Sequence, residues 1–432
     1  MTQNSNHFSS SENEQPKNGY LISASFLYIL LIVYGTLFPL SGWQWDIGGL
    51  NILLNATWPS QLTRSDVVVN LLIYIPLGYL LCILVDRIIF NSRQPTASMI
   101  LATLIGAGIC ILLEYFQTFL PSRITSYVDI ALNTAGTMLG AALAVMTGKN
   151  TAFAFWLLSF KSKWFVDQPL TNLALLTLFL WAMSQLTPLI PSPDIGNLRN
   201  GIKLVYFTIL SPSTFMYGQA FTYFFNILAL GLLLSIFLNP DQPLLKKLSV
   251  FIFLVLLLKI PMIDRQLSLE ALAGASAAIL LCIVFSSGSS RFQSLLSIFF
   301  LLLAFTISGL TAAESSEFIH QQMNWVPFAQ QMGSINGLID ITFSIWPFMA
   351  LACLTLVLSP NGAFLMGMFG ILVVLSLSFY IEWSQQYFID RYPDITDVIL
   401  AVVTYTISYW RFNKYLYHRP DYSYQPVGKL IE

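Results

Sequence analysis

Long uninterrupted runs of apolar residues constrain the fold of this chain more than any other feature. The runs are about 17 to 21 residues long, which is the length that a helix needs to cross roughly 30 Å of hydrocarbon. Of the 432 residues, 56% are hydrophobic and only 9% are charged, whereas a soluble globular chain carries roughly 25% charged residues. So few charges cannot cover a surface that faces water. The sequence therefore predicts an all-α integral membrane protein.

Proline, glycine and charged residues divide the apolar sequence into about twelve predicted transmembrane helices. Only a short turn around Asp264 and Arg265 separates the seventh span from the eighth. The predicted spans cover residues 21–39, 66–85, 98–117, 127–147, 170–187, 219–238, 247–263, 268–286, 293–311, 338–358, 362–382 and 394–411.

Lysine and arginine residues outside the spans predict the orientation of the chain. The N-terminus and every second loop together carry 13 of the 20 basic residues, and the opposite side carries six. Because basic loops stay in the cytoplasm, we expect both termini to be cytoplasmic and the protein to lie in the cell membrane. Lys259 falls inside a span, where we expect it to pair with Asp264 or Glu270 or to reach the interface.

Several classes of partner are not indicated by the sequence. The formal net charge of −1 provides no basic surface for nucleic acid. The four cysteines are far apart and lie in apolar runs, and His320 is a lone histidine, so we predict neither a metal site nor a disulfide framework. No phosphate-binding or dinucleotide-binding motif is present, and no cofactor is predicted.

One spacing of polar residues, E-x-x-Q-x5-R-x5-D, occurs twice in the apolar sequence. The middle third of the chain has a weaker version, in which Arg265 is followed by Glu270 and Lys259 falls near the glutamine position. We therefore predict three four-helix repeats with a degenerate middle copy. The two full copies consist of Glu114, Gln117, Arg123 and Asp129, and of Glu382, Gln385, Arg391 and Asp397.

The repeats predict a division of the chain into six segments. A disordered cytoplasmic N-terminus (1–20) precedes repeat 1 (21–147), and a cytoplasmic linker (148–169) leads to the degenerate repeat 2 (170–286). Repeat 3 (293–411) is followed by a cytoplasmic C-terminal tail (412–432).

Three further motifs accompany the first copy, namely Tyr34-Gly-Thr-Leu-Phe-Pro39, Asn70-Leu-Leu-Ile-Tyr-Ile-Pro-Leu-Gly78 and Asn133-Thr-Ala-Gly136. With these motifs, residues 25–147 resemble the VanZ-like family of membrane proteins almost throughout. A second, partial resemblance covers 310–410 and includes Asn324-Trp-Val-Pro-Phe328, but Ala401 replaces the equivalent of Asn133. The resemblance implies a multi-pass protein of the cell envelope and an association with low-level glycopeptide resistance. It implies no established biochemical activity.

The polar residues of each copy are predicted to gather at the external end of a helical hairpin. Glu114 and Gln117 are three residues apart and share one helix face, and Asp129 and Asn133 share a face of the next helix. In a structural interpretation, Arg123 bridges Glu114 and Asp129 and fixes the hairpin.

In a functional interpretation, the same residues and their second copy bind or modify a lipid-linked or glycopeptide ligand at the outer leaflet. Glu114 is then a candidate general base, and whether the protein is an enzyme stays open. A twelve-span secondary transporter and a non-catalytic membrane scaffold are the alternatives. Membrane lipids are the partners common to all three hypotheses.

The three longest predicted external loops cover 40–65, 188–218 and 312–337, and the first and third contain Trp43, Trp45, Trp58 and Trp325. We expect them to lie at the membrane interface, where they would cap the polar clusters or only anchor the chain.

Overall fold

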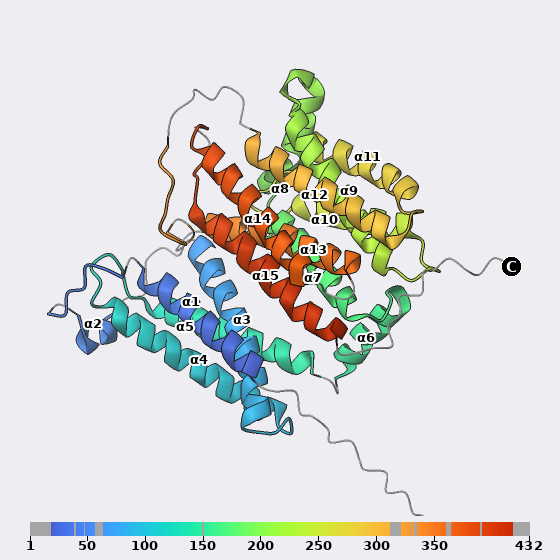
Figure 1. Cartoon of the computed structure of the whole chain (residues 1–432). Coiled ribbons are helices and arrows are strands. Elements are labelled where there is room, and N and C mark those ends of the chain that lie inside the picture. Colours follow the sequence, from blue (N-terminus) through green and yellow to red (C-terminus); the bar gives the residue numbers. More distant parts are fainter. Residues whose placement is uncertain are drawn as a thin grey trace, which may run out of the picture. The chain divides into compact units, whose positions relative to one another are not determined.

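The computed structural model of the protein describes residues 19–38, 40–46, 48–56, 64–148, 151–311, 321–329, 331, 335–359, 364–388 and 391–417. Within these ranges the chain forms fifteen α-helices, one 3₁₀-helix (η1, Pro212–Thr214) and no β-strand (Figure 1). The predicted N-terminal and C-terminal tails lie almost wholly outside the described residues, and so does His320. The helices are α1 (Gly19–Leu37), α2 (Leu50–Leu54), α3 (Arg64–Ile88), α4 (Pro95–Gln117), α5 (Tyr127–Met146), α6 (Ala152–Trp164), α7 (Pro169–Leu186), α8 (Ile195–Leu210), α9 (Tyr217–Phe237), α10 (Leu244–Lys259), α11 (Leu269–Phe285), α12 (Ser290–Leu310), α13 (Ile335–Leu358), α14 (Phe364–Gln385) and α15 (Ile395–Tyr417).

The chain forms two compact units, which are described separately. The N-terminal unit comprises residues 1–63 and 69–155, and the C-terminal unit comprises 64–68 and 156–432. The N-terminal unit therefore contains α1, α2, most of α3, α4 and α5, whereas α7 to α15 belong to the C-terminal unit.

Eight helices in the described ranges are long and apolar enough to cross a membrane, which confirms a multi-pass membrane protein. They lie in α3, α4, α5, α7, α9, α12, α13 and α14, and two shorter apolar helices cover Leu21–Leu37 and Leu269–Phe285. Two other predicted spans correspond to α10, which has only 16 residues, and to α15, which carries several polar and charged residues. The total of twelve spans stays a prediction.

Small residues allow close helix packing in the N-terminal unit. A Cβ atom on Gly136 or Gly140 of α5 would collide with the backbone carbonyl of Leu71 or Ile75 in α3. The Gly136-x-x-x-Gly140 pattern thus brings two helix backbones together, as small residues do in membrane proteins.

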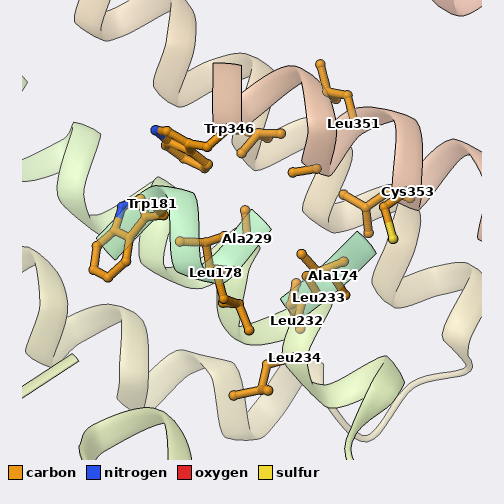
Figure 2. Packing of buried hydrophobic residues seen from close by; sticks show 14 of the residues in the cluster. Ala174, Leu178, Trp181, Ala229, Leu232, Leu233, Leu234, Trp346, Leu351 and Cys353 are labelled. Carbon is orange, nitrogen blue, oxygen red and sulfur yellow. The ribbon is translucent and has the colours of Figure 1, made fainter. Parts of the chain in front are cut away.

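The C-terminal unit has a large apolar core centred on α13. Figure 2 shows side chains from α7, α9 and α13 meeting there, among them Leu178, Leu232 and Cys353. The second half of α13, from Phe348 to Leu358, is almost wholly apolar, and α13 packs against α7, α12 and α15, so this half is buried among other helices.

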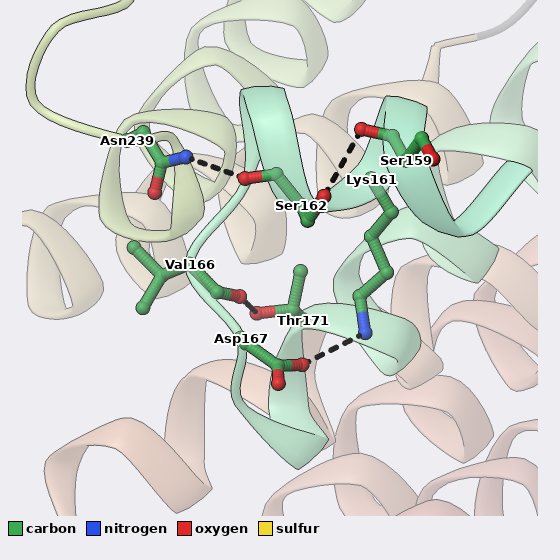
Figure 3. A network of polar contacts seen from close by, with 7 residues as sticks. All are labelled: Ser159, Lys161, Ser162, Val166, Asp167, Thr171 and Asn239. Carbon is green, nitrogen blue, oxygen red and sulfur yellow. Dashed lines mark hydrogen bonds and ion pairs between the residues drawn. The ribbon is translucent and has the colours of Figure 1, made fainter. Parts of the chain in front are cut away.

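A helix forms within the segment that the sequence predicts as a linker between repeats 1 and 2. Asn239, which follows α9, donates a hydrogen bond of 3.1 Å to the carbonyl of Ser162 near the end of α6 (Figure 3), and a second of 3.2 Å to the carbonyl of Lys163. Lys161 forms an exposed ion pair with Asp167 at 3.4 Å, which contributes little stability. Polar contacts to the backbone therefore hold the end of α6 beside the α9–α10 connection.

Candidate functional site

In the N-terminal unit, Gln117 and Arg123 bind the C-terminal end of α1. The Gln117 amide donates to the carbonyl of Thr36 at 3.0 Å. Arg123 donates to the carbonyl of Phe38 through Nε (3.1 Å) and Nη2 (2.9 Å), and to that of Gly35 through Nη2 (3.3 Å). The last carbonyls of a helix lack partners within it and carry partial negative charge. These side chains therefore cap α1.

The two acidic residues of this copy accept hydrogen bonds from other groups. Glu114, which is only 3% exposed, accepts the backbone N–H of Ser126 at 3.3 Å. Asp129 accepts the Asn70 amide at 2.6 Å, and Asn133 donates to a buried cysteine thiol of α4. Among the described residues, no ion pair joins Arg123 to Glu114 or to Asp129. The structural interpretation in which Arg123 bridges Glu114 and Asp129 is therefore wrong.

The second copy makes contacts of the same kind in the C-terminal unit. The Gln385 amide donates to the carbonyl of Gly309 at 3.2 Å. Nη2 of Arg391 donates to the carbonyls of Ser308 and Thr311 at 2.9 and 3.1 Å. The acceptors stand at the end of α12 with the spacing found at the end of α1.

The acids of the second copy also have polar partners. Glu382 accepts the backbone N–H of Asp394 at 2.9 Å, twelve positions later in the chain, as Glu114 does in the first copy. Asp397 accepts the Ser344 hydroxyl at 2.8 Å. Each carboxylate at the second hairpin is thus held by a hydrogen bond.

Arg265 has the corresponding position in the middle third of the chain. Its Nε donates to the carbonyl of Thr187, directly after α7. Burial lowers the pKa of the Arg265 guanidinium, and nearby Tyr223, Asp264 and Asp340 act in the opposite direction. Since an arginine keeps its proton across the physiological range, Arg265 is a cation here.

The predicted external loops lie against these helical hairpins. Asn324 pairs with Asp394, both through the backbone and through a side-chain hydrogen bond of 3.1 Å. In the middle third, the N–H of Ser192 donates to the carbonyl of Pro261 at 2.8 Å. The loops therefore fix the connections that carry the polar residues.

A polar cavity of about 790 Å³ lies inside the C-terminal unit. It is lined by residues of α7 to α10 and α12 to α15, and of the connections after α10 and α14. The predicted site residues Glu382, Gln385, Arg391 and Asp397 all line it, while the first-copy residues belong to the N-terminal unit. Its other charged lining residues are Lys259, Asp264, Arg265 and Asp340.

The cavity extends from the helix ends into the membrane-spanning part of the bundle. Along α13 it runs from Asp340 to Phe348, roughly 12 Å at the rise of an α-helix. On α9 it reaches Asn226, which is near the middle of that span. Trp181 and Trp346 lie at one end of the apolar core in Figure 2 and line the cavity as well. A polar space therefore meets the hydrophobic core at these two side chains.

Three buried hydrogen-bond donors in the cavity wall have no acceptor within the described residues. They are Nη2 of Arg265, Nε of Arg391 and the indole N–H of Trp346. A buried donor without a partner costs roughly 1–3 kcal/mol. Three such donors around one cavity are the arrangement expected of a site for a ligand with several acceptor oxygens.

Sequence reasoning missed the contribution of the middle third to this site. Lys259 is buried, makes no ion pair with Asp264 or Glu270, and donates to the Tyr223 hydroxyl at 2.7 Å. The expected ion pair with Asp264 or Glu270 is therefore wrong, and the alternative that Lys259 reaches the interface stays a prediction. The available signal was that Lys259 and Arg265 take the glutamine and arginine positions of the repeat pattern.

The structure provides no metal site in the part of the chain that it describes, since no three His, Cys, Asp or Glu residues come together suitably. Residues 25–148 match the family model VanZ/LLP1. No curated protein and no solved structure matches the chain. The protein is therefore a multi-pass membrane protein in which residues 25–148 are similar to the VanZ/LLP1 family.

Proposed function

We propose that this protein binds the anionic headgroup of a lipid-linked ligand at the outer leaflet, in the polar cavity of its C-terminal unit. The observation that carries the proposal is the set of three unsatisfied buried donors on Arg265, Arg391 and Trp346. The planar guanidinium of arginine can donate two hydrogen bonds at once to the oxygens of a phosphate or a carboxylate. A volume of about 790 Å³ is adequate for a headgroup with several polar substituents.

The carboxylates in the cavity narrow the class of headgroup. Asp340, Glu382 and Asp397 would repel a simple polyanion and would accept hydrogen bonds from hydroxyl or amine groups. The ligand class is therefore an oxyanion that also carries hydroxyl or amine donors, such as a phosphoglycerol, a sugar phosphate or a glycopeptide.

The architecture proposed for this function is twelve spans in three four-helix repeats. It is supported by the three arginines, Arg123, Arg265 and Arg391, each of which donates to a carbonyl at the C-terminal end of a helix. With both termini in the cytoplasm, the cavity opens toward the outside of the cell membrane. In this arrangement repeats 2 and 3 form the binding site.

For the first copy we propose a structural role. Glu114 is buried and accepts a backbone N–H, which leaves it poorly placed to reach a substrate as a general base. Gln117 and Arg123 bind backbone carbonyls, and Asp129 and Asn133 bond to neighbouring helices. These five residues therefore hold a helical hairpin against α1 and α3.

Lipid retention by the delipidated full-length protein in detergent micelles tests the proposal. Native mass spectrometry would compare dioleoylphosphatidylglycerol, which offers a phosphate and hydroxyl groups, with dioleoylphosphatidylcholine. Trp346→Phe is the sharpest variant, because the indole N–H makes no hydrogen bond within the described part of the protein. We expect phosphatidylglycerol to bind about tenfold more weakly, from a loss of roughly 1.5 kcal/mol.

Two further variants complete this experiment. Arg265→Gln combined with Arg391→Gln should lower retention of phosphatidylglycerol by about a hundredfold or more. Arg199→Gln, which changes an exposed arginine of α8, is the matched control and should have no effect. Equal retention of both lipids by the unaltered protein, or full retention by the Trp346 and arginine variants, would refute the proposal.

A secondary transporter is the alternative that the depth of the cavity favours, because transporter sites lie near the middle of the membrane and the cavity reaches Asn226. Flux of a labelled headgroup compound into proteoliposomes, driven by an ion gradient and lost in Arg265→Gln, would support transport over binding alone.

A further inference from the structure

A second concave surface lies on α12 and α14, the two helices that also form one wall of the polar cavity. It is an open groove of about 680 Å³, lined mainly by apolar side chains such as Leu303, Leu372 and Leu377. Both helices are membrane-spanning candidates, so we expect this groove to face hydrocarbon. Phe299 and Leu372 are 58% and 59% exposed, so the groove is not covered by other helices.

The groove and the polar cavity lie on opposite faces of this helix pair. On α12, Leu303 and Thr306 line the groove while Phe305 and Ser308 line the cavity. At about 100° per residue the two pairs point in roughly opposite directions. Side chains of α14 divide in the same way, and the α12–α14 pair therefore separates the lipid-facing groove from the cavity.

The contact between these two helices is narrow and is closed by few groups. Gly309 of α12 faces Ile381 of α14, and a Cβ atom placed on Gly309 would lie 3.6 Å from the Cβ of Ile381. At the end of α12, Gln385 donates to the carbonyl of Gly309 and Arg391 donates to the carbonyl of Ser308. Arg391 thus closes the contact with Nη2, while its Nε in the cavity wall has no acceptor among the residues that the structure describes.

We infer that the contact between α12 and α14 is a lateral portal for a lipid, whose hydrocarbon chain occupies the groove while its headgroup occupies the cavity. This inference rests on the proposed function and names the route and the chain-bearing class of ligand. A headgroup attached to a long chain cannot enter a charged cavity unless the chain stays in hydrocarbon. The groove supplies hydrocarbon-facing space on the same two helices. Arg391 links the entry of the lipid to the binding of its headgroup, because its guanidinium bonds across the closed portal and also offers a donor to the headgroup.

A reversible disulfide across the portal tests this inference. The Cβ distance of 3.6 Å between positions 309 and 381 is within the range of about 3.5–4.5 Å that a disulfide needs. The full-length Gly309→Cys/Ile381→Cys variant would be delipidated and then measured oxidised and reduced. The unaltered protein, treated with the same oxidant, is the control for its four native cysteines.

Two lipid probes with different chain lengths distinguish the entry route through the portal from the binding site in the cavity. We expect the oxidised variant to retain dioleoylphosphatidylglycerol at least tenfold less than the reduced variant. Water-soluble dihexanoylphosphatidylglycerol should bind equally in both states, because it can enter from the open end of the cavity. Equal retention of the long-chain lipid in both states would overturn the portal and leave the binding site intact. Failure of the unaltered protein to bind either probe would instead overturn the proposed function.

Filling the groove provides a second measurement that needs no disulfide. Ser376→Trp places a large side chain in the groove, and Leu365→Trp places one at a position of α14 that is 78% exposed and outside the groove. We expect Ser376→Trp to weaken retention of the long-chain lipid about tenfold without affecting the short-chain lipid. Identical behaviour of the two tryptophan variants would contradict the role of the groove.

Discussion

Replacement of Arg123 measures how strongly the end of α1 depends on one side chain. Arg123→Met removes the charged donor from two carbonyls, those of Gly35 and Phe38. Hydrogen bonds to charged groups contribute roughly 1.5–3 kcal/mol each, so the two acceptors together give about 3–6 kcal/mol. Arg123 is half-buried, and water at the membrane surface would replace part of this. We therefore expect a loss of about 2–4 kcal/mol.

The four cysteines provide the assay. All are buried, and Cys82 and Cys110 lie in the N-terminal unit. Thermal unfolding in detergent, followed with a thiol-reactive fluorescent dye, would report on this unit if only these two cysteines are retained. Arg123→Lys should recover about half of the loss, because a lysine ammonium reaches one carbonyl without the fork geometry.

The control for Arg123 is Arg87→Met, which changes an exposed arginine of α3 in the same unit. Its effect should stay within about 0.5 kcal/mol, as is usual for surface positions. If Arg123→Met and Arg87→Met unfold at the same temperature, Arg123 does not cap α1 and the structural role proposed for the first copy is wrong.

Further predictions concern packing, a buried carboxylate and orientation. Gly140→Leu should destabilise the N-terminal unit by about 1–3 kcal/mol in the dye assay. Gly108→Leu is the control and should not destabilise it, because a Cβ atom at Gly108 meets open space. Glu382→Ala should cost roughly 1–3 kcal/mol, because the buried N–H of Asp394 loses its acceptor, and Glu382→Gln should cost less; equal losses would contradict this. A reporter fused to the C-terminus should be active only in its cytoplasmic form, and extracellular activity would refute the predicted orientation.

The resemblance of the two E-x-x-Q-x5-R-x5-D copies was visible in sequence because spacing within a hairpin is a local property. Their bonding partners were not visible. Gln117 and Arg123 bind carbonyls more than 80 residues earlier in the chain, and backbone carbonyls leave no trace in the side-chain pattern. The sequence therefore suggested an acid–arginine bridge, whereas in the folded chain the acids accept from N–H and hydroxyl groups and the arginines donate to carbonyls.

The role of the middle third of the chain was also not visible in sequence. Lys259 and Arg265 seemed to be remnants of a degenerate repeat, yet they line the cavity together with Glu382 and Arg391. Their place in one cavity follows from tertiary packing, because the lining comes from helices that are distant in sequence, and no spacing rule within a single copy predicts it.

The sequence by itself determined the membrane class, the spans in α3, α4 and other long apolar helices, and the spacing of the charged residues, because hydropathy and helix length act locally along the chain. The tertiary structure alone decided which charges meet, which donors stay without acceptors, and where a polar cavity lies within the bundle. Those properties depend on the register between helices distant in sequence, and in a membrane that register is set by side-chain packing rather than by the pattern of apolar and polar residues.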